Sequence, residues 1–394
     1  MSTKASPFPL SRRPRIILTS RRRSAGYGGI AIIAILGIVA ATVTVTSLNA
    51  SALRNDQDRK TTYALAQAKQ ALIGRAASDG SRPGSLPCPD VNNDGLVTMN
   101  EDYVGSACVS YVGRLPWKYL GMPDLRDADG ERLWYAVSPN FRDLGTVVVN
   151  GGTMGTLDVA GNMAVADAAA IVFAAGTSVG NQNRSGANVN AAAQFLDGAN
   201  GAANAHVAGF QSQAPTTTFN DRMLAVMPTE ITSATGVRVT REISAAFDAY
   251  LSAGSATLPW AASPSNLDCQ SSGTATSCTA QTGLTTGIVP AFPASTYPAS
   301  PAAPTETEQA YLAYLNGPLG PNGWFQKNDW RQWVAYTVTA ACATSACKES
   351  GASSFKVSKY SGNTSDLAGA KSQLTLYKTD STGMYWTTTT YLVK

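Results

Sequence analysis

The stretch Ser24–Leu53, SAGYGGIAIIAILGIVAATVTVTSLNASAL, decides how the rest of this 394-residue chain is interpreted, because thirty consecutive residues carry no charge. Its apolar centre begins at Gly28, and residues 28–48 match the length of about 20 residues that a helix needs to cross a bilayer. Seven Lys and Arg residues precede the stretch, and the first acidic residue is Asp56. The positive-inside rule therefore predicts a single-pass inner-membrane protein with a cytoplasmic N-terminus and a periplasmic or extracellular C-terminal head.

A cleaved secretory signal is the alternative interpretation of this stretch. Signal peptides share the basic start and the apolar core, although that core usually has about 7–15 residues. The small residues of Asn49–Ala52 could then serve as the cleavage site.

The basic run before the apolar stretch, Arg21–Tyr27 or RRRSAGY, ends in a glycine followed by an aromatic residue. It resembles the prepilin signal of type IV pilins and type II secretion pseudopilins. The resemblance implies cleavage by a prepilin peptidase after Gly26, with Tyr27 as the new N-terminus. Ala31 stands at the fifth mature position, where most of these proteins carry Glu, and its absence is typical of minor subunits at the filament tip. The segments RPGSLPCPD and GRLPWKYLGMPDLRDADGERLWYAVS are also similar to bacterial prepilin-type proteins of poorly defined role.

The expected fold class is α+β, with a long N-terminal helix, transmembrane and then amphipathic, packed on a mostly antiparallel β head with large loop insertions. A membrane anchor followed by an unrelated amphipathic helix is the open alternative. Apolar runs predict a strand at 132–137, a buried strand or short helix at 168–175 and a helix at 240–253. The expected organisation is a leader at 1–26, the long helix at 27–78, a head at 79–258, a Pro/Ser/Thr-rich excursion at 259–304 and a mainly β part at 305–394.

Charge and cysteine content bound the function classes. Seven of the 30 Lys and Arg residues lie in the leader, which leaves 23 against 26 Asp and Glu, so no basic face for nucleic acid is predicted. Six cysteines behind an export signal favour disulfides. Zinc is disfavoured because His206 is the one histidine. Proximity in the sequence suggests the pairs Cys88 with Cys108, Cys269 with Cys278, and Cys342 with Cys347.

The segment 90–101, DVNNDGLVTMNE, has the spacing of an EF-hand calcium loop, with Gly95 at the turn position. Pro83 and Pro87 precede it, so we expect a lone loop without the helices of a true EF-hand. An Asx-rich turn without an ion is the alternative. The predicted Ca²⁺ ligands are Asp90, Asn92, Asp94, the backbone carbonyl of Leu96, and Glu101.

A second acidic cluster follows between residues 124 and 131. It could bind a second calcium ion, but Asp-Gly at such a place more often forms a turn that leads into a strand. The residues concerned are Asp124, Asp127, Asp129 and Glu131.

The sequence does not predict an enzyme. A Ser-His-Asp system would have to use His206, and no Gly-x-Ser-x-Gly elbow appears near the right architecture. No phosphate-binding loop that ends in Lys-Ser or Lys-Thr is present. The predicted function is a minor pilin-like or pseudopilin-like subunit at the tip or start of a type IV pilus or type II secretion-like filament. Its expected partners are other pilin subunits, the prepilin peptidase and the inner membrane, with no nucleic acid. The alternative is a membrane-tethered periplasmic binding or adhesive module that never enters a filament.

Overall fold

The computed structural model describes residues 50–202, 209–253, 257–263, 265–269, 278–293, 306–338, 353–357, 372–379 and 385–392. The chain divides into two units, residues 1–56 and 57–394. Several predictions lie outside the described residues: cleavage between Gly26 and Tyr27, the span 28–48, His206, and the pair Cys342 and Cys347.

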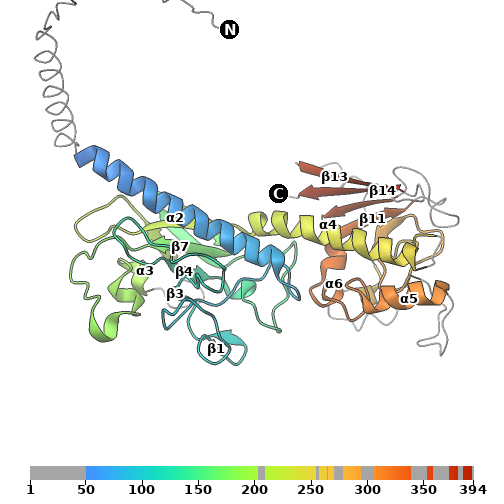
Figure 1. The fold of residues 1–394 in the computed structure, drawn as a ribbon, viewed down its shortest axis with the longest axis horizontal. Coiled ribbons are helices and arrows are strands. Elements are labelled where there is room, and N and C mark those ends of the chain that lie inside the picture. Colours follow the sequence, from blue (N-terminus) through green and yellow to red (C-terminus); the bar gives the residue numbers. More distant parts are fainter. Residues whose placement is uncertain are drawn as a thin grey trace, which may run out of the picture. The chain divides into compact units, whose positions relative to one another are not determined.

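Helix α2 (Ala50–Ser78) lies along one face of a four-stranded antiparallel sheet (Figure 1). The helix side that faces the sheet is formed by small and aliphatic residues at helical spacing, and these residues are buried. Alanines in this stripe let the helix backbone come close to the strands. The buried stripe consists of Ala64, Leu65, Ala68, Leu72 and Ala76.

The central sheet has the order β3-β4-β7-β9, and every pairing in it is antiparallel. All residues of β4 and β7 are buried, because the sheet is covered on both faces. Tyr135 and Val172 point to the α2 side, whereas Trp134 and Phe173 point to the other side. The strands are β3 (Val112–Arg114), β4 (Trp134–Val137), β7 (Ala170–Ala174) and β9 (Arg222–Val226).

A smaller sheet has the order β6-β5-β8 and packs on the face of the central sheet that is opposite to α2. The two sheets together form one hydrophobic cluster. Phe173 of the central sheet contacts Phe210 of the smaller one, with ring centroids 5.1 Å apart. The strands β5 and β8 are parallel, which departs from the expected antiparallel pattern. The elements of this region are β5 (Leu157–Gly161), β6 (Val165–Ala168), β8 (Gly209–Ser212) and α3 (Ala199–Ala202). The hairpin of β1 (Tyr103–Val104) with β2 (Ala107–Cys108) instead contributes Tyr103 and Cys108 to the cluster on the α2 side.

The C-terminal elements form their own aromatic cluster around helix α4 (Pro228–Ser252). Phe247 of α4 lies 6.1 Å from the ring of Tyr314 and 5.4 Å from the ring of Tyr336, between centroids. Helices α5 (Glu306–Asn316) and α6 (Trp324–Lys327) belong to this part, as do the antiparallel strands β10 (Thr286–Ile288), β11 (Val334–Val338) and β12 (Ser353–Val357), and the hairpin of β13 (Ser372–Thr379) with β14 (Tyr385–Leu392). Short 3-10 helices occupy Pro139–Phe141, Gly186–Asn188, Ala192–Gln194, Leu267–Cys269 and Trp330–Trp333.

Arg331 is fully buried within this C-terminal cluster. Its guanidinium donates to the Gln326 side chain at 2.6 Å and to the backbone carbonyls of Val289 and Pro290 at 2.8 Å each. Burial lowers the pKa of Arg331 to about 10. The side chain therefore connects β10, the α6 region and the start of β11 through hydrogen bonds to neutral acceptors.

Two of the three expected disulfides are confirmed. Cys88 is bonded to Cys108 with Cα atoms 5.5 Å apart, and Cys269 is bonded to Cys278 with Cα atoms 4.8 Å apart. All four cysteines are buried.

The membrane-spanning part of the predicted fold and the predicted single-pass inner-membrane location are wrong by the described structure. No helix in the described ranges is long and apolar enough to cross a membrane. The helix that was expected to continue from the membrane half, α2, begins at Ala50 and carries Arg54, Asp58 and Lys60 in its first turns. The α+β class with antiparallel sheets holds.

Replacing Leu72, which is fully buried between α2 and the sheet, tests this packing. We expect Leu72→Ala to lower the free energy of unfolding by about 2–5 kcal/mol, because it removes buried methyl groups and leaves a cavity. Urea unfolding followed by circular dichroism measures the change. The control is Tyr63→Ala on the same helix, since Tyr63 is 66% exposed and its loss should cost far less. Equal losses for the two variants would contradict the described face of α2.

Candidate functional site

The predicted calcium loop lies between the first disulfide cysteine and the β1 hairpin. Cys88 anchors its start, and the backbone of Asp90 exchanges two hydrogen bonds with that of Arg114, at 3.0 and 2.8 Å. Its far end leads into β1, which is paired with β2 and thereby with Cys108. The loop is therefore closed at both ends by covalent and backbone contacts.

Asp90 is the buried centre of the loop. One carboxylate oxygen accepts the backbone N–H of Asn93 at 2.6 Å, and the other accepts that of Gly95 at 2.7 Å. Burial raises the pKa of Asp90, with further contributions from Asp94 and Asp102. The chain thus wraps around this first-position carboxylate.

The third and twelfth positions of the loop are brought together. The Asn92 amide nitrogen donates to Glu101 Oε2 at 3.3 Å, and the Thr98 hydroxyl donates to the same oxygen at 3.0 Å. Asp94 Oδ1 accepts the backbone N–H of Leu96 at 2.7 Å. The predicted ligands Asn92 and Glu101 therefore meet although nine residues separate them.

Asp102 is a residue of this loop that the sequence motif does not assign. It is buried, and its carboxylate accepts the backbone N–H groups of Val91 at 3.1 Å and Thr98 at 2.8 Å. It therefore connects the start of the loop, at Val91, to its second half, at Thr98. Its place directly after Glu101 was the only signal in the sequence, and the calcium pattern gives that position no role.

The donors of the loop suit calcium in kind, because carboxylate, amide and carbonyl oxygens are the ligands that this ion prefers. Within the residues that the structure describes, no three Asp, Glu, His or Cys side chains are gathered closely enough to hold a metal ion. The predicted set also uses the Asn92 amide and the Leu96 carbonyl. Calcium at this loop therefore stays a prediction, supported by the meeting of Asn92 with Glu101.

The four acidic residues of the second cluster face different partners. Asp124 forms ion pairs with Arg126 at 2.7 Å and with Arg132 at 2.8 Å. Asp129 is exposed. Glu131 lies 3.5 Å from an Arg184 guanidinium nitrogen. The second calcium site stays a prediction. Asp124 and Glu131 each already have an arginine guanidinium beside the carboxylate.

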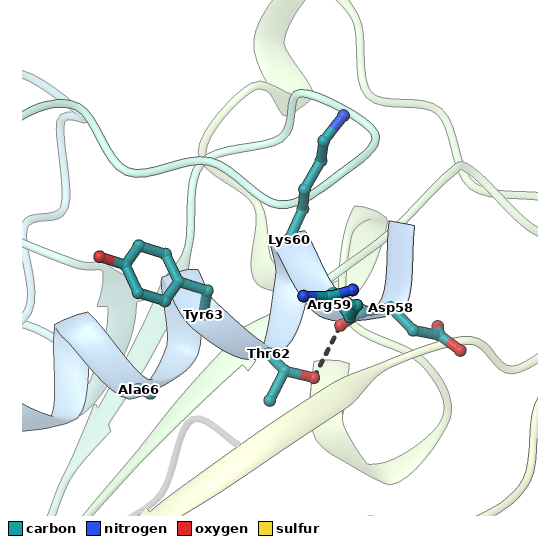
Figure 2. Close-up of a pocket in the computed structure, with 6 residues that line it drawn as sticks. All are labelled: Asp58, Arg59, Lys60, Thr62, Tyr63 and Ala66. Atoms are coloured by element: carbon teal, nitrogen blue, oxygen red, sulfur yellow. Dashed lines mark hydrogen bonds between the residues drawn. The ribbon is translucent and has the colours of Figure 1, made fainter. Parts of the chain in front are cut away.

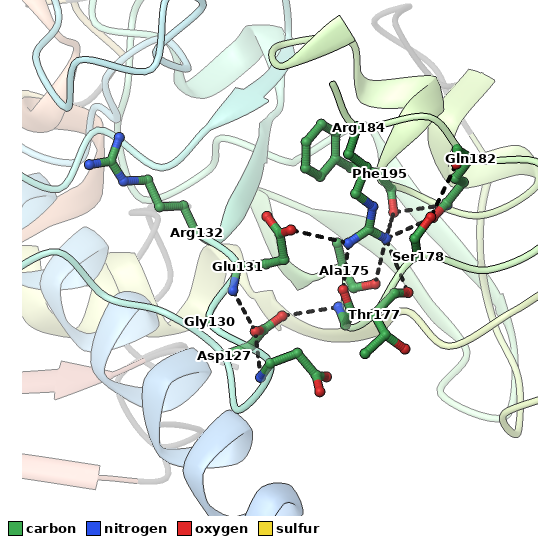
Figure 3. Close-up of polar contacts among 12 residues, drawn as sticks. Asp127, Gly130, Glu131, Arg132, Ala175, Thr177, Ser178, Gln182, Arg184 and Phe195 are labelled. Carbon is green, nitrogen blue, oxygen red and sulfur yellow. Dashed lines mark hydrogen bonds and ion pairs between the residues drawn. The ribbon is translucent and has the colours of Figure 1, made fainter. Parts of the chain in front are cut away.

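Asp127 organises the turn in this second cluster, as Figure 3 shows. Its Oδ1 accepts the backbone N–H groups of Asp129 at 3.0 Å and Glu131 at 2.9 Å, and its Oδ2 accepts that of Gly176 at 3.0 Å. Burial raises the pKa of Asp127. The Asp-Gly turn leads into the strand that begins at Trp134, as the alternative interpretation of the sequence expected.

Arg184 gathers the loops beside this turn (Figure 3). Its guanidinium donates to the Gln182 side chain at 2.7 Å and to the Phe195 carbonyl at 3.2 Å. Gln182 in turn donates to Asp197 at 2.8 Å. Arg184 is therefore connected through Gln182 to Asp197, which belongs to a buried pair of carboxylates.

That pair is Asp197 and Asp221, each buried and each accepting the other's backbone N–H, at 2.8 and 3.0 Å. Asn200 donates to Asp221 Oδ2 at 2.8 Å, and Asp221 Oδ1 has no hydrogen-bond partner among the described residues. Burial, with the adjacent Asp197 carboxylate, raises the pKa of Asp221 from its ordinary 3.8 to about 7. Protonation of Asp221 is therefore favoured up to a higher pH than that of an ordinary carboxyl group.

An open hollow on α2 is lined by charged and polar side chains (Figure 2). Thr62 in it donates to the Asp58 carbonyl at 2.7 Å. Arg222 at the start of β9 reaches Asp58 at 2.8 Å and Thr62 at 2.9 Å. The described lining consists of Asp58, Arg59, Lys60, Thr62, Tyr63 and Ala66, a mixture typical of a solvated helix face.

Comparison with protein-family models, with curated proteins and with solved structures finds no match to this chain.

The Asp197–Asp221 pair predicts a dependence of stability on pH. Because folding raises the pKa of Asp221 from 3.8 to about 7, its contribution is full below about pH 4 and is lost as the pH rises through 7. We expect the free energy of unfolding of Asp221→Asn, which resembles the protonated acid, to fall less over this range than that of the natural protein. Urea unfolding at several pH values measures the difference. The exposed Asp167, replaced by Asn, is the control and should leave the profile unchanged. Parallel profiles for Asp221→Asn and the natural protein would contradict the raised pKa of Asp221.

Proposed function

We propose that this chain is a structural, non-enzymatic subunit of a pilin-like filament, of the type IV pilus or type II secretion kind, and that it occupies the tip or starts the fibre. Other pilin-like subunits and the prepilin peptidase are its partners. The proposal joins the Arg21–Tyr27 segment, with its cleavage point after Gly26, to the architecture of the part that follows.

The observation that carries the proposal is the two-sided character of α2. One side is buried against the sheet β3-β4-β7-β9, and the other side exposes Asp58, Lys60 and Tyr63 (Figures 1 and 2). A filament subunit needs a helix that is fixed to its own head on one side and free for neighbouring subunits on the other. The position at the tip rests on Ala31, where most pilins carry Glu.

We further propose that the loop Asp90–Glu101 binds calcium and that the ion is structural. The support is the EF-hand spacing, the buried Asp90 and the contact of Asn92 with Glu101. The loop has few apolar side chains of its own. Val97 packs against the hydrophobic core, and an ion would fix the rest of the loop. Asp90, Asn92, Asp94, the Leu96 carbonyl and Glu101 would hold it.

The first experiment for the loop compares two exposed carboxylates. We expect CaCl2 to raise the melting temperature of the full chain, since binding to the folded state adds about 2.7 kcal/mol at 100 times Kd. Glu101→Gln should weaken calcium binding at least tenfold in calorimetric titration, because it removes the twelfth-position carboxylate. Asp129→Asn in the second cluster should bind as the natural chain does. Loss of binding in Asp129→Asn alone would assign the ion to the second cluster instead.

The filament proposal is tested by mass spectrometry of the protein isolated from its native cells. We expect a mature chain that begins at Tyr27, particularly with a methylated amine, because the prepilin peptidase cuts after the glycine. A Gly26→Ala variant, which should block the cut, is the matched control. An intact leader in the natural protein, or a chain that begins near Ala52, would refute the proposal and leave a binding or adhesive module outside any filament.

A further inference from the structure

Residues that flank the second acidic cluster, between 117 and 132, contact the backbone of the calcium loop. The Asn93 carbonyl accepts from Arg132 at 2.8 Å, and the Gly95 carbonyl accepts the backbone N–H of Tyr119 at 3.0 Å. Between them, the Asp94 carbonyl accepts from the Lys118 ammonium. Three successive carbonyls of the loop are thus held by groups that come from outside it.

Arg132 makes the most specific of these contacts. One of its guanidinium nitrogens donates to both the backbone oxygen and the side-chain Oδ1 of Asn93, at 2.8 and 3.0 Å. Asn93 has a φ of 67°, in the left-handed region that is uncommon for residues other than glycine. Arg132 therefore fixes the residue whose backbone reverses the chain between Asn92 and Asp94.

The other edge of Arg132 is held by a carboxylate of the same segment. Asp124 accepts from Arg132 Nε at 2.8 Å and from its Nη2 at 3.1 Å, the two-point geometry that orients a guanidinium. Asp124 also places a negative charge beside Arg132, and Arg126 pairs with the same carboxylate.

The loop also packs closely against Trp117. Gly95 has a φ of 86°, and a Cβ atom there would come within 2.6 Å of the Trp117 indole nitrogen. The Arg132 guanidinium lies 5.8 Å from the centre of the Trp117 ring. Trp117, Lys118 and Arg132 thus form one wall against the loop residues Asn93–Gly95.

We propose that Arg132 is a positioning residue for calcium: it holds Asn93 in the left-handed conformation, and the Asp124–Arg132 pair thereby preforms the turn that directs Asn92 and Asp94 towards the ion. This inference rests on the proposed calcium loop. It also gives Asp124 a role in the first loop that differs from the predicted role as ligand of a second ion.

Arg126 provides a matched control for this proposal. It binds the same Asp124 carboxylate, at 2.7 Å, and it also donates to the Gly130 carbonyl, at 2.8 Å, rather than to the calcium loop. Arg126→Gln and Arg132→Gln remove the same charge from the same carboxylate. They differ in the contact with Asn93.

The experiment is calorimetric titration of CaCl2 into the full chain and its variants, with melting temperatures measured in EDTA. We expect Arg132→Gln to weaken calcium affinity about tenfold, the equivalent of one lost hydrogen-bonding contact to a charged group. Arg126→Gln should remain within about twofold of the natural chain, in keeping with an exposed ion pair. Arg132→Lys, which keeps the charge but cannot bridge Asn93 and Asp124 with a planar fork, should fall between them.

The possible results distinguish failure of the positioning role of Arg132 from failure of the calcium site itself. If the natural chain shows neither heat of binding nor a calcium-dependent rise in melting temperature, the calcium loop itself is refuted. If the natural chain binds and Arg132→Gln binds equally well or more tightly, or if Arg126→Gln is weakened to the same extent, the positioning role of Arg132 is overturned. Should Arg132→Gln not fold in EDTA, Arg132→Lys decides: weakened affinity supports the role, and unchanged affinity overturns it.

Discussion

The fold depends on burial of the central strands β4 and β7 from both sides. Because neither strand has a solvated face, the sheet requires α2 on one side and the smaller sheet on the other. Leu72 and Val172 belong to the first of these contacts, and Phe173 and Phe210 to the second. Full burial of such a side chain contributes about 1.5–3 kcal/mol, so the apolar stripe of α2 matters more to the head than any single ion pair.

Polar side chains then fix the loops that these hydrophobic layers leave uncovered. Asp90 and Asp127 do this by accepting several backbone N–H groups each, whereas Arg132 and Arg331 do it by donating to carbonyls. The two kinds of contact are complementary, because every residue of an irregular segment has both a donor and an acceptor to satisfy. In the second acidic cluster, Asp127 forms a turn in this way, whereas Asp124 and Glu131 form ion pairs.

The sequence predicted those features that depend on short-range patterns. The strand expected at 132–137 is β4, the apolar run at 168–175 contains β7, and both described disulfides join the nearest cysteines. The start of the helix expected at 240–253 is a local feature that the apolar spacing missed, because the helix begins at Pro228 and Glu230 accepts the Met227 N–H at 2.8 Å, and both residues are helix-start signals. Long-range contacts were not predictable. The contact of Arg132 with Asn93 spans 39 residues, and the Asp197–Asp221 pair spans 24, so no local motif could show either.

Both described disulfides join cysteines that are close in the chain, separated by 20 and by 9 residues. The entropy lost on closing a loop grows with its length, so each thiol meets its native partner more often than a distant one even before the chain folds. Oxidation can therefore precede formation of the sheet without trapping the chain in a wrong topology. The two disulfides can then form in either order, because the pairing of the cysteines in each region depends only on the chain between them.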